Sequence, residues 1–236
     1  MDAKTISPGP TRREDGEHTR EQLLNSAEKF FADQGFHATS VRQIVDLAGC
    51  NIAAVNYHFH SKDNLYQEVV RRRLSTFREI LLKQIRSTTA VGESSPKLAA
   101  VLASYAKTFI EPLVEQSKNR RLFQLFAREM HDSRLLPDLL LTELVEPVEQ
   151  ALVQAIAGAC PGLAPRELSV CVHLFMGQLL HLLRMQVYFG PERCSQLGFP
   201  LSPASVTRIV RFTTGGICAM KSSPEGDSEL STKARE

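Results

Sequence analysis

The side chains best suited to recognising a ligand lie close together between residues 39 and 62. The amide of Asn56 can make a bidentate contact with adenine, and an exposed Ile52 or Ala53 can meet the methyl group of thymine. A hydroxyl group such as that of Tyr57 suits a phosphate oxygen. These residue types indicate recognition of duplex DNA, without bonds being made or broken.

The same stretch gives little support to metal binding or catalysis. His58 and His60 could hold a metal, but no carboxylate or cysteine is spaced to complete the site. The chain also lacks paired carboxylates, a nucleophile beside a base and a glycine-rich phosphate loop. We therefore expect no metal, no cofactor and no enzyme. A helical enzyme and a helical protein-interaction module that does not bind DNA are the two alternatives.

Two short helices joined by a tight turn must position the recognition residues. Ser40 can cap the first helix, Gly49 can end it, and Asn51 can cap a second helix that runs to Phe59. The apolar spacing predicts that Val41, Ile44, Val45, Ala48, Val55 and Phe59 face inward. It leaves Ala53, Ala54, Asn56 and Tyr57 facing outward. This is the arrangement of a helix-turn-helix, in which the second helix enters the major groove.

Further helices flank this pair. Thr19 is a good N-cap with Gln22 three residues later, and apolar residues then recur at helical steps until Gly35. Ser61 can cap a fourth helix that runs into the 80s. The sequence thus predicts a three-helix domain followed by a long connecting helix.

The stretch resembles the TetR family of transcriptional regulators. That family has a Thr/Ser-rich entry, an Ala-Gly-Val-Ser turn, then Tyr-x-His-Phe and Ser-Lys-x-x-Leu. Over residues 18–66 this chain has Ala48-Gly49-Cys50-Asn51, Tyr57-His58-Phe59 and Ser61-Lys62-Asp63-Asn64-Leu65. The string from Asn51 to Phe59 resembles the CecR-type subgroup, and the later Arg121-Leu122-Phe123 and Arg128-Glu129-Met130 are similar to that subgroup's ligand domain.

The resemblance implies roles for individual residues. Positions that contact phosphates in the family are matched here by Ser40, Tyr57, His58 and Lys62. Positions that face base edges are matched by Arg42, Ile52, Ala53 and Asn56. With Thr39 and Asn51, these residues form the DNA-binding set that we expect. Ala54 stands where relatives often have Thr, which would remove a phosphate contact, and Cys50 replaces the usual Val and should fill the core.

The charge of the chain does not itself indicate DNA binding. The formal net charge is +2, and residues 1–73 contain ten Lys and Arg residues and ten Asp and Glu residues. A neutral domain must bind DNA through directed donors rather than through bulk charge. Arg12 and Arg13 could form a minor-groove arm, although a flexible tail is the more ordinary interpretation.

The C-terminal part is predicted to be a larger helical domain. Its helices should cover roughly 95–116, 118–132, 136–158, 165–189 and 202–220, which makes about nine helices in an all-α fold. Leu168 to Phe189 has the length of a membrane span, but it carries charged and polar residues, so we expect a buried helix. Residues 1–17 form the predicted arm, 18–64 the DNA-binding domain, 65–220 the ligand-binding and dimerisation domain, and 221–236 a disordered tail.

The helix from Leu168 to Phe189 is apolar nearly all round, so one face should pack on its own core and the other on a partner chain. We expect two helices from each subunit to form a four-helix dimer interface that includes Leu168, Phe175, Leu179, Leu182, Ile209 and Ile217. The alternative is a fully internal core helix. A dimer would place two reading helices about 34 Å apart on a palindromic site.

The inner helices should enclose a mostly apolar ligand cavity. Its expected lining is Phe123, Phe126, Met130, His173, Met176 and Arg184, although the polar residues among these could equally make surface or core contacts. Five widely spaced cysteines and the lack of a secretory signal indicate a reducing compartment, the cytoplasm. The expected function is a regulator, by family default a repressor, that binds double-stranded operator DNA as a homodimer and is released by an effector of unknown identity; activation is the alternative.

Overall fold

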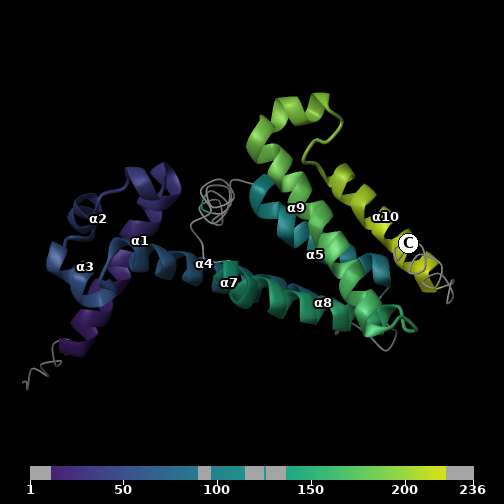
Figure 1. Ribbon diagram of the computed structural model, residues 1–236, viewed down its shortest axis with the longest axis horizontal. Coiled ribbons are helices and arrows are strands. Elements are labelled where there is room, and N and C mark those ends of the chain that lie inside the picture. Colours follow the sequence, from purple (N-terminus) through teal and green to yellow (C-terminus); the bar gives the residue numbers. More distant parts are fainter. Residues whose placement is uncertain (1–11, 90–96, 115–124, 126–136, 222–236) are drawn as a thin grey trace, which may run out of the picture. The chain divides into compact units, whose positions relative to one another are not determined.

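The computed structural model describes residues 12–89, 97–114, 125 and 137–221, which are almost entirely helical and contain no strand (Figure 1). The chain divides into two compact units, unit 1 with residues 1–73 and 121–135 and unit 2 with the rest, so one boundary falls between Arg73 and Leu74. This point lies inside helix α4 (Lys62–Thr89), which contributes its first part to unit 1 and its second part to unit 2. The all-α class that the sequence predicts is confirmed.

Unit 1 contains α1 (Arg12–Ala38), α2 (Val41–Ala48), α3 (Ile52–Phe59) and the beginning of α4. Its core takes Leu23, Leu24, Ala27 and Phe31 from α1, all of which are buried. The ring of Tyr66 on α4 meets that of Phe31 edge to face, at 4.9 Å between centroids. The predicted apolar face of the first helix therefore forms the centre of the unit.

The predicted start of the first helix is wrong. It begins at Arg12 instead of Thr19, and the Thr19 hydroxyl donates to the carbonyl oxygen of Asp15 at 2.8 Å within the helix. Once the apolar face has nucleated a helix, each added residue gains a backbone hydrogen bond at low entropic cost, so the helix extends into the polar segment. Residues 12–17 are thus helical rather than an arm, whereas Gly35 breaks the helix as expected, with φ 84° and ψ 171°.

Unit 2 contains the rest of α4, α5 (Leu98–Val114), α7 (Pro137–Leu140), the π-helix η1 (Leu141–Val145), α8 (Glu146–Ala159), α9 (Pro165–Gln196) and α10 (Pro203–Lys221). Helix α5 contacts α8, α9 and α10, and α9 also contacts α8 and α10. Aromatic rings from three helices meet in the core: Phe77 of α4, Tyr105 and Phe109 of α5, and Phe175 of α9. The predicted helix over 118–132 lies outside the described residues except for Leu125.

The helix predicted over 136–158 is interrupted. A π-helical stretch separates α7 from α8, and Pro147 lies in the first turn of α8. Proline has no backbone N–H, so Pro147 cannot donate to the carbonyl oxygen of Glu143, four residues earlier. The Arg78 guanidinium donates to that oxygen at 2.9 Å. A side chain from α4 thus donates to the carbonyl oxygen to which Pro147 cannot donate.

Helix α9 runs seven residues beyond its predicted end, with a kink at Gly190, where φ is 73°. By length and composition, its stretch Pro165–Gln186 is the one candidate membrane span among the described residues. Leu168, Phe175 and Leu179 of this stretch are nevertheless buried inside unit 2. A core helix of a helical domain gives the same signal.

Candidate nucleic-acid interface

Helix α2 is fixed at its start by a complete capping box. The Ser40 hydroxyl oxygen accepts from the Gln43 backbone N–H at 3.2 Å, and the Gln43 side-chain oxygen accepts from the Ser40 backbone N–H at 2.8 Å. These two bonds satisfy backbone donors that a helix start otherwise leaves unpaired. The predicted Ser40 cap is confirmed, and Gln43, which the sequence did not single out, completes it.

The turn between α2 and α3 depends on a left-handed residue. Gly49 has φ 67° and ψ 28°, a conformation that glycine adopts without steric cost. Asn51 then caps α3, because its side-chain oxygen accepts from the Ala54 backbone N–H at 3.0 Å. The predicted turn and cap are both confirmed. Cys50 between them is only partly buried, so the expectation that it fills the core is wrong; its thiol donates to the Ala48 carbonyl oxygen instead.

The inward faces of both helices are those that the spacing predicts, with Val41 only partly buried. Ile44, Val45 and Ala48 of α2 are buried, as are Val55 and Phe59 of α3. Helix α1 contacts both of these helices. Burial at positions 55 and 59 determines the rotation of α3 about its own axis, and therefore which side chains face solvent.

The outward face of α3 carries the predicted recognition residues. Ile52, Ala53, Asn56 and Tyr57 are exposed, and Tyr57 is 80 % exposed. His58 is partly buried, with its ring edge to face against that of Tyr57. An amide, a hydroxyl and apolar groups therefore share one face of a short, capped helix.

Thr39 does not belong to this face. Its side chain is 2 % exposed, and its hydroxyl donates to the Gly35 carbonyl oxygen at 2.6 Å. The expectation that Thr39 contacts DNA through its side chain is therefore wrong. Its hydroxyl pairs with a carbonyl at the Gly35 break, where the helical hydrogen-bond pattern is interrupted. A Thr/Ser-rich sequence alone cannot tell such a local bond from a surface contact.

Six cations of unit 1 fall into two groups. Arg42 is exposed on α2. At the start of α4, the Lys62 ammonium lies 4.1 Å from the centre of the Phe36 ring. Arg20, Arg71, Arg72 and Arg73 are instead paired with carboxylates on α1 and α4. Internal pairing thus uses much of the positive charge, which agrees with recognition by directed contacts.

A polar hollow of about 300 Å³ lies beside the end of α3. His58, His60 and Asn64 line it together with Arg20 and Glu68. His60 has φ 66°, which non-glycine residues rarely adopt, and its backbone N–H donates to the Asn56 carbonyl oxygen at the end of α3. The described residues contain no group of three or more His, Cys, Asp or Glu side chains placed to hold a metal.

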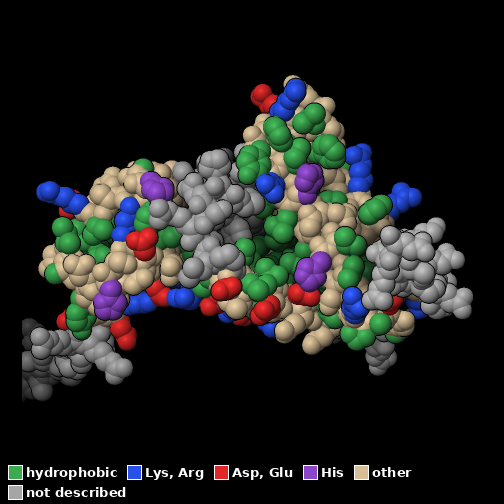
Figure 2. Space-filling model, in the orientation of Figure 1, with side chains coloured by type: hydrophobic (Ala, Val, Ile, Leu, Met, Phe, Trp, Pro, Cys, Tyr) green, Lys and Arg blue, Asp and Glu red, His purple; other side chains and the backbone are tan. Residues whose placement is uncertain are grey.

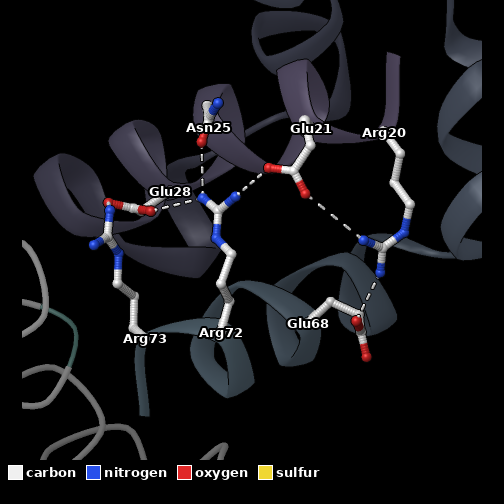
Figure 3. Close-up of polar contacts among 7 residues, drawn as sticks. All are labelled: Arg20, Glu21, Asn25, Glu28, Glu68, Arg72 and Arg73. Carbon is white, nitrogen blue, oxygen red and sulfur yellow. Dashed lines mark hydrogen bonds and ion pairs between the residues drawn. The ribbon is translucent and has the colours of Figure 1, made fainter. Parts of the chain in front are cut away.

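Sequence reasoning missed an ion-pair network between α1 and α4 (Figure 3). Glu28 on α1 is buried and pairs with both Arg72 and Arg73 on α4. The run of three arginines and the polar residues at helical spacing on α1 were the available signal. Spacing shows that such side chains share a face, but not which distant helix that face meets.

Two family models match the chain. Residues 23–69 match the model described as bacterial regulatory proteins of the tetR family, and residues 107–216 match a tetracyclin repressor-like C-terminal domain. The chain belongs to the TetR family. It is therefore a DNA-binding transcriptional regulator, and the family resemblance predicted from residues 18–66 is confirmed.

Individual relatives agree with this assignment. The chain is 28 % identical over 183 residues to the probable regulator YttP of Bacillus subtilis, covering 76 % of this chain and 81 % of that protein. It is 44 % identical to the repressor KstR2 of Mycolicibacterium smegmatis over 52 residues, or 22 % of this chain and 25 % of that protein. These relatives are named as regulators rather than enzymes.

Solved structures share the fold. A TetR-family regulator from Mesorhizobium loti superposes with a TM-score of 0.65 at 18 % identity, covering 89 % of this chain and 98 % of that one. FadR of Bacillus subtilis, solved in complex with stearoyl-CoA, gives 0.60 at 17 % identity, covering 83 % and 98 %. At these identities the likeness concerns the arrangement of helices.

In this TetR-family chain, most of the residues predicted for the dimer contact lie in its own core. Leu168, Phe175, Leu179, Leu182 and Ile217 are buried within the single chain, and Ile209 is partly buried. The buried set must pack against α5, α8 and the other helices of unit 2, so it is unavailable to a partner chain. The periodicity identified two apolar faces on α9, and the predicted dimer contact used the one that is buried in the single chain.

The other apolar face is exposed. Val170, Leu174 and Leu180 of α9 are exposed, as is Phe212 of α10, which is 75 % exposed. Figure 2 shows hydrophobic side chains gathered over α9 and α10, with histidines among them. Single exposed apolar residues are ordinary, whereas a row of them along adjacent helices is typical of an interface.

The structure also changes the expected ligand pocket. His173 and Arg184 are exposed, Met176 is partly buried, and Phe123, Phe126 and Met130 lie outside the described residues. A groove of about 310 Å³ instead lies between α5 and α10, with a mostly apolar lining of Ala103, Lys107, Ile110, Glu111, Pro203, Val206 and Thr207. The predicted polar residues of α9 do not line this groove.

Proposed function

We propose that this TetR-family regulator is a repressor that binds a palindromic operator as a homodimer and is released by a small molecule. The outward face of α3 carries the proposal. Tyr57 and Ile52 are exposed there beside Asn56, and α3 contains no acidic residue. Exposed aromatic and apolar groups on an eight-residue helix do little for folding, and they match the base edges and phosphates of a major groove.

Selection from random duplexes tests the DNA-binding part. We expect the full chain to enrich a palindrome, and Asn56→Ala to lose about 1–3 kcal/mol of preference at one base position of each half-site. Gln154→Ala, which removes an exposed amide on α8, is the matched control and should bind as the wild type does. No enriched palindrome would favour a protein-interaction module, and normal discrimination by Asn56→Ala would contradict the assigned face.

The exposed apolar face of α9 and α10 supports the proposal of a homodimer. We place the four-helix contact on Val170, Leu174 and Phe212, in place of the buried residues predicted from the sequence. A side-chain carbon at Gly177, Gly215 or Gly216 would meet only open space, so a partner helix could approach closely there. Two subunits related by a two-fold axis would then present two α3 helices to successive major grooves.

A groove in unit 2 supports the proposal that a small molecule releases the operator. The groove between α5 and α10 has a volume at the lower end of the range for small-molecule sites, and its few polar groups are Lys107, Glu111 and Thr207. We propose that it binds a small, largely apolar effector with one polar end. Stearoyl-CoA, the ligand in the FadR structure, is larger than this groove, so smaller apolar compounds with one polar end are screened beside it.

A groove-filling variant tests this site. Compounds, stearoyl-CoA among them, would be screened for release of labelled operator, and active compounds would be repeated on Val206→Trp. We expect Val206→Trp to stop responding while its affinity for the operator is unchanged. Leu141→Trp, which places the same side chain on an exposed part of unit 2, should respond normally. An unchanged response of Val206→Trp would show that the effector binds elsewhere.

Two finer assignments complete the proposal. We infer membership of the CecR-type subgroup, supported by the string from Asn51 to Phe59 and by Arg121-Leu122-Phe123. We also infer a cytoplasmic location, because an operator-binding protein must reach DNA, and the five cysteines are free thiols. Binding of the selected palindrome by a subgroup member would support the first assignment.

A further inference from the structure

The carboxylate of Glu28 lies at the centre of a contact between α1 and α4. It is 1 % exposed, and its two oxygens have different partners on consecutive residues of α4. One oxygen accepts from Arg72 at 2.9 Å, and the other pairs with Arg73 (Figure 3). We call these three residues the Glu28 clamp.

Arg72 is held by more than Glu28. Its guanidinium also donates to the carboxylate of Glu21 and to the side-chain oxygen of Asn25, each at 2.9 Å. Residues 21, 25 and 28 follow one another at helical steps, so they form a single stripe along α1. A planar guanidinium with three acceptors along a stripe restrains both the rotation and the axial position of α4 against α1.

A second ion pair between α1 and α4 also contacts α3. Arg20 on α1 pairs with Glu68 on α4 at 2.9 Å, and its guanidinium carbon lies 5.3 Å from the centre of the Phe59 ring. Phe59 is the last residue of α3 and is buried. The orientation of α3, the proposed recognition helix, is therefore connected through α1 to that of α4.

The clamp lies at the end of unit 1. Arg73 is the last residue before the division, and α4 continues as a helix to Thr89 in unit 2. A displacement of α4 changes the direction of α3 only if α1, α3 and the first part of α4 move as one body. Leaving a buried carboxylate unpaired is strongly unfavourable, so the clamp opposes any movement that separates these helices.

We propose that the Glu28 clamp determines which spacing between two operator half-sites the regulator accepts. This inference rests on the proposed dimer and palindrome. One inserted base pair rotates a half-site by roughly 35° about the DNA axis and shifts it by about 3.4 Å. A rigid link between α3 and α4 cannot follow this change, whereas a loosened link can.

Operators with altered spacing test the clamp. The selected palindrome would be compared with versions one or two base pairs longer or shorter, using full-length wild type and Glu28→Gln. We expect the wild type to lose at least about tenfold in affinity for each changed spacing. Glu28→Gln keeps the side chain's shape but not its charge. Its spacing ratio, the affinity for the selected palindrome divided by that for a changed spacing, should fall to within about threefold. Glu17→Gln, the same change at an exposed position of α1, should keep the wild-type ratio.

The ratio of affinities for the two operators distinguishes a residue that positions α3 from one that only stabilises the fold. A residue that only stabilises the fold would weaken binding to every operator by the same factor, and an unchanged ratio in Glu28→Gln would overturn the proposal. If Glu28→Gln does not fold, Arg72→Lys decides, because it keeps the charge and loses the planar fork; it should lower the ratio too. A wild type that binds the palindrome but accepts all spacings equally overturns the clamp alone. A wild type that binds no palindrome overturns the proposed function with it.

Discussion

The Arg78 guanidinium donates to the backbone carbonyl oxygen of Glu143 at 2.9 Å and to the carboxylate of the same residue at 3.0 Å. Pro147 cannot supply the helical hydrogen bond that this carbonyl would otherwise accept. One arginine of α4 thus satisfies the backbone where η1 passes into α8. The contact lies wholly within unit 2, so it can be tested separately from DNA binding.

Arg78→Met should destabilise unit 2. The substitution keeps much of the aliphatic stem but removes the charged donor from the two half-buried oxygens of Glu143, which costs about 1–3 kcal/mol of the free energy of unfolding. Urea denaturation followed by circular dichroism measures it. Arg86→Met is the matched control, since Arg86 is exposed on the same helix, and it should change the free energy by less than about 0.5 kcal/mol. Equal losses in both variants would show that the Glu143 contact contributes nothing specific.

Tyr57→Phe and Lys62→Met should weaken operator binding in different ways. The tyrosine hydroxyl is neutral, so its loss should cost about 1 kcal/mol in each half-site and leave the salt dependence unchanged. Loss of the lysine charge should instead lower the slope of log affinity against log salt by about one per half-site. Fluorescence anisotropy at several salt concentrations distinguishes the two. A changed slope in Tyr57→Phe would contradict its assignment as a neutral phosphate donor.

The helix-turn-helix could be predicted from the sequence because its determinants are local. Ser40, Gly49 and Asn51 act on backbone groups within three or four residues. Burial of Val55 and Phe59 follows from their spacing on one short helix. When caps and apolar period agree over twenty residues, very few arrangements remain, and the outward residues are determined by elimination.

The remaining features depend on contacts between distant parts of the chain. Leu179 and Leu174 are both apolar residues of α9, and only the packing of α5, α8 and α10 makes the first buried and the second exposed. The pairing of Glu28 with Arg72 likewise joins residues 44 apart. Periodicity divides a helix into faces but does not tell which face meets the protein's own core. For this reason the predicted dimer contact included residues that the protein's own core buries, namely Leu168, Phe175, Leu179, Leu182 and Ile217.

Phe212→Glu should produce a monomer. The side chain is 75 % exposed on α10, so a charge there leaves the fold of the single chain intact, but it would be buried in the proposed four-helix contact. Light scattering should give half the wild-type mass, with an unchanged circular dichroism spectrum and an operator affinity lowered by at least about a hundredfold. Leu141→Glu, at an exposed leucine of η1, should remain dimeric. A dimeric Phe212→Glu would place the interface elsewhere.

Tyr105→Phe should remove part of the alkaline instability of the protein. Burial among the rings of Phe109 and Phe175 raises the pKa of Tyr105 well above its usual value. Above the unfolded pKa of about 10, the unfolded chain has lost this proton while the folded chain keeps it. The stabilisation by the neutral hydroxyl is thus complete below that pH and is lost as the pH rises, at about 1.4 kcal/mol per pH unit.

Urea midpoints measured after short incubations between pH 8 and 11.5 test this expectation. The curves of wild type and Tyr105→Phe should run parallel up to about pH 10, and the wild type should then fall more steeply. Tyr188→Phe, which removes an exposed hydroxyl and retains Tyr105, should follow the wild type. Parallel curves over the whole range would mean that the Tyr105 hydroxyl ionises in the folded protein, and thus that water reaches the aromatic core of unit 2.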